Sequence, residues 1–301
     1  MLAVQFDKPG STDALLLNET AEPSAGPGEV LIEFEASTIN PADVKIREGS
    51  IPPRAGTVPF TLGYDLVGVV VANGPGAHRH AVGTRVVGMS ALALTGRGTW
   101  SERVCLPESS IARAPEGVSP AVAAQLPLAG LTALQAVQVL APAPETDILV
   151  TGAAGAIGRL AVQLLHRKGQ RVHALVRDEV QAAALPSGEV AEVHLGAVPD
   201  NVAEGVVDTI GADFSSALRP GGSYVGVVPG CLPSKAAPSM AGKTAKVIVT
   251  RESGEGLDAL ARLVERQELV LPTPAIYSLE KIREAHEEYE RRTGRRIAIV
   301  R

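Results

Sequence analysis

The sequence predicts an α/β protein in which a β-rich, barrel-like module is followed by a doubly wound, six-stranded parallel sheet. Through about residue 115, short β-type runs alternate with Pro-Gly or Gly-rich turn signals, which indicates an antiparallel module. From Pro120 onward, β-type runs alternate with segments of helical period, which is typical of βαβ units. At 301 residues the chain has room for two domains and for an active-site cleft between them.

The elements of the first module are predicted as strands at 30–35, 66–72, 85–89 and 101–106. Helices at 121–126 and 131–140 lead into the second module, where helices at 158–168 and 179–185 alternate with strands. The six strands are predicted at 148–151, 171–176, 192–195, 205–209, 223–228 and 245–249. A helix at 257–266 closes this block, and the last helix and strand, at 279–292 and 296–300, are expected to pack back on the first module. The predicted domains are therefore 1–118 completed by 268–301, and 119–267.

The composition is that of a globular protein, with 45% hydrophobic and 20% charged residues. The longest apolar runs end short of the ~20 residues that span a bilayer, so we expect no membrane partner. The first residues carry no export signal, which favours the cytoplasm. A net charge of −5 without a basic run argues against a nucleic-acid partner, and two cysteines, Cys105 and Cys231, cannot form a disulfide framework.

A glycine turn lies between the predicted strand at 148–151 and the helix that follows it. Gly152, Gly155 and Gly158 have the spacing G-x-x-G-x-x-G. Glycine permits a tight turn and a close approach of backbone to a pyrophosphate, while the unpaired N–H groups of the helix start attract negative charge. Strand, turn, helix and second strand in this order predict a Rossmann-type dinucleotide site rather than a purely structural turn. Further contacts to the cofactor are expected from Ala154, Ala156, Ile157, Gly211 and Val227.

The end of the second strand of this unit, at residues 176–178, indicates which dinucleotide binds. An acid there would accept from the 2′-hydroxyl of NAD, whereas an arginine would pair with the 2′-phosphate of NADP. Arg177 comes first after the strand and Asp178 second, so we expect NADPH, with Arg177 as the phosphate partner. One alternative is NADH, with Asp178 as the ribose ligand. The other is that Arg177 and Asp178 are simply solvated charges of a turn and bind no cofactor.

Several segments in the right order resemble the medium-chain dehydrogenase/reductase superfamily, in its zinc-independent quinone oxidoreductase (zeta-crystallin-like) branch. Residues 39–49 resemble the Asn-Pro-x-Asp-x-x-x-Arg-x-Gly element of this branch, and residues 62–70 its Gly-x-Asp-x-x-Gly-x-Val strand. Residues 82–88 correspond to the family's Gly-Asp-x-Val element with Thr84 in place of the aspartate. Further similar segments lie at 98–102, 123–133, 218–222 and 293–297. The resemblance covers nearly the whole chain and implies a GroES-like substrate domain beside a Rossmann cofactor domain.

The sequence lacks the metal ligands of the zinc alcohol dehydrogenases in this superfamily. Those enzymes hold catalytic zinc through a cysteine of the first domain, a Gly-His-Glu pair and a further cysteine or acid. In this chain Gly63 is followed by Tyr64 and Asp65, and residues 40–43 contain no thiolate. A structural zinc lobe would need four cysteines. We therefore expect no zinc, and we assign His78 and His80 to a solvated loop.

Without a Lewis acid, the chemistry that the resemblance implies is hydride addition to an activated acceptor, a quinone or an α,β-unsaturated carbonyl. Asn40 lies where the branch has an asparagine near the nicotinamide, and an Asx-type turn before Pro41 is the structural alternative. Thr132 resembles the threonine that faces the nicotinamide in relatives, and a helix threonine bonding its own backbone is the alternative. Both are predicted to position the reactants.

Two residues are predicted to line the substrate pocket. Ile51 follows the Arg-x-Gly element where some enoyl reductases of the superfamily carry a proton-donating tyrosine, so it is expected to form an apolar wall. Tyr64 is the second, with simple packing of its ring as the alternative. The shape of the pocket depends on the loops at 50–57 and 228–244, which the sequence does not determine.

The sequence therefore predicts an NADPH-dependent quinone or enone reductase. Two alternatives stay open: an enoyl or ketone reductase dedicated to one pathway, and a structural protein that keeps the nucleotide fold without chemistry. The resemblance also implies a homodimer, formed through the last strand of the cofactor sheet at about 246–249.

Overall fold

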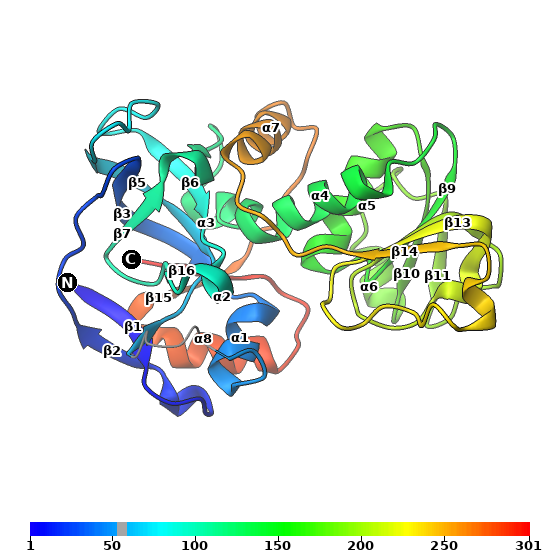
Figure 1. Ribbon diagram of the computed structural model, residues 1–301, viewed down its shortest axis with the longest axis horizontal. Coiled ribbons are helices and arrows are strands. Elements are labelled where there is room, and N and C mark those ends of the chain that lie inside the picture. The colour runs from blue at the N-terminus through cyan, green and yellow to red at the C-terminus, as the bar shows by residue number, and fades with distance from the viewer. Residues whose placement is uncertain (53–58) are drawn as a thin grey trace. The chain divides into compact units, whose positions relative to one another are not determined.

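A computed structural model describes residues 1–52 and 59–301, so the loop expected at 50–57 lies largely outside the described residues. The chain divides into two compact units, Met1–Leu128 with Arg251–Arg301, and Ala129–Thr250 (Figure 1). This division differs from the expected boundaries after residues 118 and 267. The main reason is the helix Gly254–Glu265 (α7), which packs on strand Ile111–Arg113 (β8) and therefore lies in the first unit.

The first unit is built mainly from antiparallel strands. Its larger sheet has the order β15-β16-β3-β5-β6-β8, with β7 also paired to β3, and its smaller sheet has the order β2-β1-β4. The bounds are Leu2–Phe6 (β1), Leu16–Glu19 (β2), Glu29–Thr38 (β3), Phe60–Thr61 (β4), Asp65–Asn73 (β5), Arg85–Met89 (β6), Arg103–Pro107 (β7), Ala275–Ser278 (β15) and Ile297–Val300 (β16). The last strand pairs with β3, which confirms that the C-terminal stretch packs back on the first module.

Among the described residues, the first unit has four α-helices that are shorter than α7. They are Pro41–Glu48 (α1), Leu92–Thr95 (α2), Pro120–Ala123 (α3) and Ile282–Glu290 (α8). The core is made of alternate strand residues that point inward, among them Phe34, Leu66 and Ile299, together with the fully buried Trp100. The Trp100 indole N–H donates to Ser37 Oγ at 2.9 Å, so its one polar group is satisfied.

The second unit is a six-stranded parallel sheet with the order β11-β10-β9-β12-β13-β14, which is the strand order of the Rossmann fold. The fold class predicted from the sequence is confirmed. Its strands are Asp147–Thr151 (β9), Arg171–Val176 (β10), Glu192–Leu195 (β11), Ala203–Asp208 (β12), Leu218–Gly226 (β13) and Thr244–Val247 (β14). Its helices are Leu131–Leu140 (α4), Ala156–Arg167 (α5) and Glu179–Ala183 (α6).

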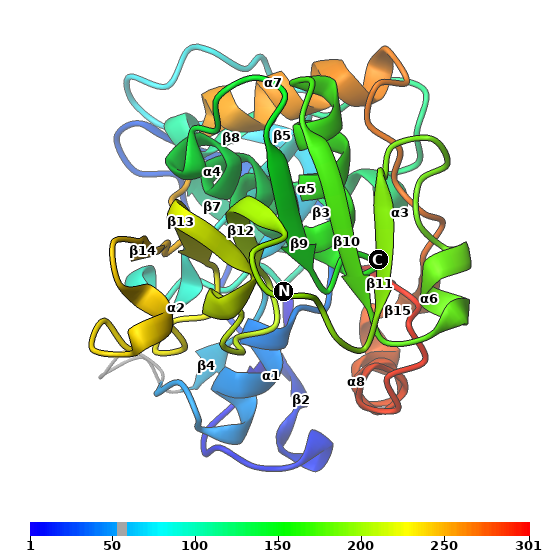
Figure 2. The same cartoon turned by 90° about the vertical axis from the view of Figure 1, so that its right-hand side faces the viewer.

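The two faces of this sheet are covered differently. Helix α5 packs on β9 and β10, and α4 packs on α5, β12 and β13. The connections that follow β11 and β12, residues 196–202 and 209–217, are fully described and contain no α-helix. In Figure 2 strands β9, β10 and β11 accordingly lie in front, with α5 behind them.

The stretch Pro120–Leu140 is long and apolar enough to cross a membrane by length and composition alone. It exceeds the length expected for the apolar runs of this chain. Of its most apolar window, 67% is buried inside the structure, as in the core helix of a soluble protein.

Candidate functional site

The parallel sheet reverses its winding between β9 and β12, and such a reversal is where open α/β sheets bind ligands. The chain runs outward from β9 through β10 to β11, and it then returns to β12 on the other side of β9. The crevice at the carboxyl ends of β9 and β12 is therefore the expected position of a nucleotide. The glycine turn follows β9 directly.

The backbone of the glycine turn requires two of its glycines. Gly152 has a φ of 58°, in the left-handed region that favours glycine. A Cβ on Gly158 would lie 2.2 Å from the Gly152 carbonyl oxygen, so only glycine lets α5 approach the turn so closely. Gly155 is the N-cap of α5, and no side chain of a described residue caps this helix start. The N–H groups of the first turn, which begins with Ala156 and Ile157, are thus available to an anion.

The carboxyl ends of β9 and β12 are tied together by side-chain hydrogen bonds. Thr151 Oγ1 donates to Asp208 Oδ1 at 2.6 Å, and Thr209 Oγ1 donates to the Thr151 carbonyl at 2.7 Å. The Asp208 carboxylate also accepts from the Gly211 N–H, and the Val227 N–H donates to the Asp208 carbonyl at 3.0 Å. Two of the expected cofactor residues are therefore held by Asp208, which sequence reasoning missed. An acid at the end of the predicted strand at 205–209 was the available signal.

At the end of β10 the structure gives Arg177 and Asp178 different roles. Asp178 is the N-cap of α6, and its Oδ1 accepts from the Gln181 N–H at 2.9 Å. The side chain of Arg177 is exposed and forms no ion pair with any described residue. The carboxylate is occupied by the helix start, whereas the guanidinium is available to an external anion.

Thr132 lies in α4, is 97% buried, and its Oγ1 is 2.6 Å from Thr250 Oγ1. Either hydroxyl can be the donor in this contact. The contact joins α4 to the segment that follows β14. Among the expected cofactor residues, Ala154 lies in the turn itself and is partly buried.

In the first unit Asn40 lies in a buried polar cluster with Asp43 and Asp65. The Asn40 side-chain amide donates to Asp65 Oδ2 at 2.7 Å and to the Thr38 carbonyl at 3.4 Å, and its backbone N–H donates to Asp43 Oδ2 at 2.9 Å. Asn40 also begins α1, next to Pro41 at N1. Its donors are therefore all engaged within the unit, which is the geometry of a positioning residue.

One guanidinium lies beside the two carboxyl groups of this cluster. Arg296 donates to Thr38 Oγ1 at 3.0 Å and to Asn40 Oδ1 at 3.4 Å. Burial raises the pKa of Asp65 and, together with repulsion from Asp65, raises the pKa of Asp43 well above its ordinary value. Burial also lowers the pKa of Arg296, although both carboxylates oppose that shift. Local sequence does not predict the whole cluster, because Asp65 and Arg296 come from parts of the chain distant from Asn40 and Asp43.

The two residues expected to line the substrate pocket are both partly enclosed. Tyr64 is 7% exposed, and burial, with the nearby Asp43, raises the pKa of its hydroxyl far above the usual range. It therefore stays protonated at neutral pH. Ile51 packs against the core of the first unit, and its N–H donates to the Lys45 carbonyl at 3.0 Å.

The donors at the zinc position of the related alcohol dehydrogenases do not fit that metal. The oxygens of Asp65 already accept from Thr38, Asn40 and the Leu128 N–H, and Tyr64 stands where the imidazole ligand would be. Burial raises the pKa of Cys105 to about 11, so this thiol is protonated at neutral pH and is a poor ligand and nucleophile.

Comparison with known proteins gives matches to three family models. Residues 26–116 match the alcohol dehydrogenase GroES-like domain, residues 180–295 the zinc-binding dehydrogenase family, and residues 148–210 the NAD dependent epimerase/dehydratase family. The last of these includes the glycine turn.

Two relatives and one solved structure are similar over most of the chain. A chloroplastic quinone-oxidoreductase, QR1, of Triphysaria versicolor is 30% identical and covers 95% of this chain and 93% of its own. A chloroplastic quinone-oxidoreductase homolog of Spinacia oleracea is 33% identical, over 76% of this chain and 75% of its own. The quinone oxidoreductase of Coxiella burnetii superposes with a TM-score of 0.86 at 26% identity, over 100% of this chain and 99% of its own.

Proposed function

Since this chain belongs to the medium-chain dehydrogenase/reductase superfamily, in its quinone oxidoreductase branch, we propose that it is an NADPH-dependent reductase of quinones or α,β-unsaturated carbonyls. The family is one of pyridine-nucleotide oxidoreductases. Bound NADPH would supply a hydride to the electrophilic carbon of such an acceptor. The observation that carries the proposal is the uncapped start of α5 behind the glycine turn, in a unit that also exposes Arg177 after β10.

The preference for NADPH over NADH rests on the contrast between neighbouring side chains. The Asp178 carboxylate accepts from Gln181 N–H, whereas Arg177 has no ion pair with a described residue. A guanidinium makes charge-assisted hydrogen bonds to a phosphate. Its hydrogen bond to an uncharged 2′-hydroxyl is weaker. The first turn of α5 would bind the pyrophosphate with its N–H groups.

The reaction is proposed to proceed without zinc, because the donors of the first unit are bound to one another. Asn40 and Thr132 act as positioning residues, Asn40 by holding Asp65 and Thr132 through its hydroxyl contact with Thr250. Ile51 and Tyr64 would contribute an apolar wall and a protonated phenol to the acceptor site. We further propose that the protein is a homodimer paired along β14.

The activity is tested by following NADPH consumption at 340 nm with a panel of quinones, alkenals and cyclic enones, beside NADH as the parallel cofactor. We expect turnover with at least one acceptor class and a clear preference for NADPH. Tight NADPH binding without turnover of any acceptor would instead support a nucleotide-binding protein without chemistry.

The role of Arg177 is tested separately. Arg177→Ala is expected to raise the KM and Kd for NADPH about ten- to hundredfold, because a hydrogen bond to a charged group contributes about 1.5–3 kcal/mol. The Kd for NADH should change less than about twofold in the same variant. Lys168→Ala is the matched control, since it removes one exposed positive charge at the other end of α5. An unchanged NADPH affinity in Arg177→Ala, or an equal loss in both variants, contradicts the assignment.

A further inference from the structure

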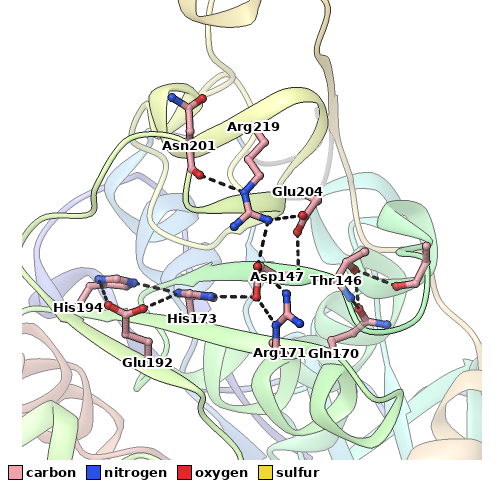
Figure 3. A network of polar contacts seen from close by, with 11 residues as sticks. Thr146, Asp147, Gln170, Arg171, His173, Glu192, His194, Asn201, Glu204 and Arg219 are labelled. Carbon is pink, nitrogen blue, oxygen red and sulfur yellow. Dashed lines mark hydrogen bonds and ion pairs between the residues drawn. The ribbon is translucent and has the colours of Figure 1, made fainter.

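A polar network lies at the amino-terminal half of the parallel sheet, away from the carboxyl ends where the glycine turn lies. It contains Asp147, Arg171, His173, Glu192 and His194, with Glu204 and Arg219 beside them (Figure 3). Strand pairing places His173 opposite Glu192, and Leu175 opposite His194. Because alternate residues of a strand share a face, both histidines and Glu192 project from the same face of β10 and β11. This is the face that also bears Leu149.

We propose that His173, Glu192 and His194 form a binding site for one zinc-class divalent cation. Their ligand atoms lie within 4.8 Å of one another. His173 Nδ1 is 3.2 Å from His194 Nε2 and 3.4 Å from Glu192 Oε2. Tetrahedral zinc with bonds of about 2.0–2.1 Å keeps its ligand atoms roughly 3.3 Å apart, so two edges of the tetrahedron are already present.

A carboxylate lies behind His173, on the side of the ring away from Nδ1. His173 Nε2 is 3.3 Å from Asp147 Oδ1. The same carboxylate accepts two hydrogen bonds from Arg171, at 2.6 and 2.9 Å. A proton on Nε2 would be donated to Asp147, and it would leave the lone pair of Nδ1 directed into the cluster. A carboxylate behind a metal-binding histidine has this same effect in known sites.

The second histidine is also available as a ligand. Its Nε2 lies 3.2 Å from His173 Nδ1, and its Nδ1 lies 3.8 Å from Glu192 Oε1. The two imidazole planes are nearly parallel, with an angle of 9° between them. Without a cation, the Nε2–H of His194 can donate to His173 Nδ1. On binding, the cation takes that position and the His194 proton moves to Nδ1.

Charge and access are both suitable for a cation. The network has three carboxylates, Asp147, Glu204 and Glu192, and the two guanidinium groups of Arg171 and Arg219, which leaves one net negative charge. The histidine side chains are only 10% and 6% exposed, whereas Glu192 is 56% exposed. The two buried imidazoles thus form the inner side of the site. The exposed Glu192 side chain can bind the cation from the solvent side. Two imidazoles and one carboxylate favour zinc, and they disfavour magnesium, which prefers oxygen ligands.

A cation here would join the edge strand β11 to β10. Among the described residues, the edge strand β11 pairs with β10 alone, and the connection after it contains no helix, so the cation would hold an edge of the sheet. The site lies away from the glycine turn and does not depend on the proposed reductase activity. Its role is therefore structural, with water as the fourth ligand.

The test is titration of the full, untagged, chelator-treated chain with Zn²⁺ by calorimetry, with Mg²⁺ as the parallel cation. We expect one equivalent of Zn²⁺ to bind with micromolar or better affinity, to raise the melting temperature, and Mg²⁺ to do neither. His194→Ala should weaken Zn²⁺ binding at least a hundredfold, and Glu192→Gln about tenfold. His78→Ala, which removes an exposed histidine of the first unit, is the matched control and should bind as the parent chain does.

Two results would overturn the proposal: Zn²⁺ binding no tighter than millimolar in the parent chain, or affinity that is the same in His194→Ala and Glu192→Gln as in the parent. If His194→Ala does not fold, Glu192→Gln decides the question, because Glu192 is largely exposed and its replacement keeps the shape of the side chain.

Discussion

In the described part of the first unit, one histidine is buried in surroundings that disfavour its protonated form. His286 of α8 is fully buried against Trp100, with ring centroids 5.4 Å apart, and its Nδ1 accepts from Arg47 Nη1 at 3.3 Å. Its Nε2 has no partner among the described residues. Burial, assisted by the Arg47 charge, lowers the pKa of His286 to about 3. The ring is therefore neutral in the folded state throughout the physiological range.

This burial predicts a loss of stability in mild acid. The unfolded histidine titrates near its ordinary pKa of about 6.5, so below that pH the unfolded chain binds a proton that the folded chain does not. Stability from this residue is complete above about pH 6.5 and falls by up to ~1.4 kcal/mol per pH unit toward pH 3. His286→Asn keeps an acceptor for Arg47 and should remove that slope. Urea unfolding between pH 4.5 and 7 measures it.

The control for this prediction is His78→Asn, because His78 is exposed in the same unit. Its stability should depend on pH as the parent chain's does. If His286→Asn keeps the parent slope, acid sensitivity arises elsewhere. The buried carboxyl groups of Asp43 and Asp65 have raised pKa values, so their effect on the pH dependence of the unfolding free energy is opposite to that of His286. The stability that they contribute to the folded protein is lost as the pH rises.

At the scale of the element, two glycines of the glycine turn have different roles: Gly158 is needed for packing, and Gly155 lies at the expected binding site. A Cβ at Gly158 would lie 2.2 Å from the Gly152 carbonyl oxygen, whereas one at Gly155 would lie 3.0 Å from the same atom. Gly155 also has a φ of −74°, which any residue adopts. The first substitution therefore strains the contact between helix and turn, and the second mainly adds a methyl group where the pyrophosphate would approach.

We predict opposite profiles for the two alanine variants. Gly158→Ala should lose about 1–3 kcal/mol of unfolding free energy, as in an overpacked core. Gly155→Ala should lose less than about 1 kcal/mol, while its NADPH affinity falls about tenfold or more. Urea unfolding and fluorescence titration with NADPH measure the two quantities. A larger stability loss in Gly155→Ala than in Gly158→Ala would contradict the assignment of roles.

These elements also show what the sequence could and could not predict. The strand Arg171–Val176 and the glycine turn follow from local period and turn chemistry, and both were predicted correctly. The short helix Pro41–Glu48 was missed, because residues 39–49 were interpreted only through their family resemblance. The polar clusters around Asp65 and around His173 depend on strand register. Strand register is set by tertiary pairing between distant segments, so it cannot be predicted from a short stretch of sequence.

At the scale of the whole molecule, the parallel sheet has two edges, each a four-residue strand that exposes apolar side chains. Within the described part of the chain, strand β14 pairs with β13 alone, and Val247 and the following Val249 are 39% and 57% exposed. Strand β11 is the other edge, with Val193 42% and Leu195 46% exposed. An unpaired edge strand with exposed valines is a template for pairing with another chain. Sequence resemblance favours β14 as the edge that pairs in the proposed homodimer.

The two edges are distinguished by matched lysine substitutions. Lysine on an edge strand opposes pairing with another chain through charge and desolvation. The double variant Val247→Lys with Val249→Lys should therefore be monomeric in light scattering after size exclusion, whereas Val193→Lys should keep twice the chain mass, as the parent does. Unfolding by urea confirms that both variants are folded, because these side chains lie outside the core. A dimer that survives at β14 and dissociates in Val193→Lys would place the interface on β11, and a monomeric parent chain would remove the proposed dimer altogether.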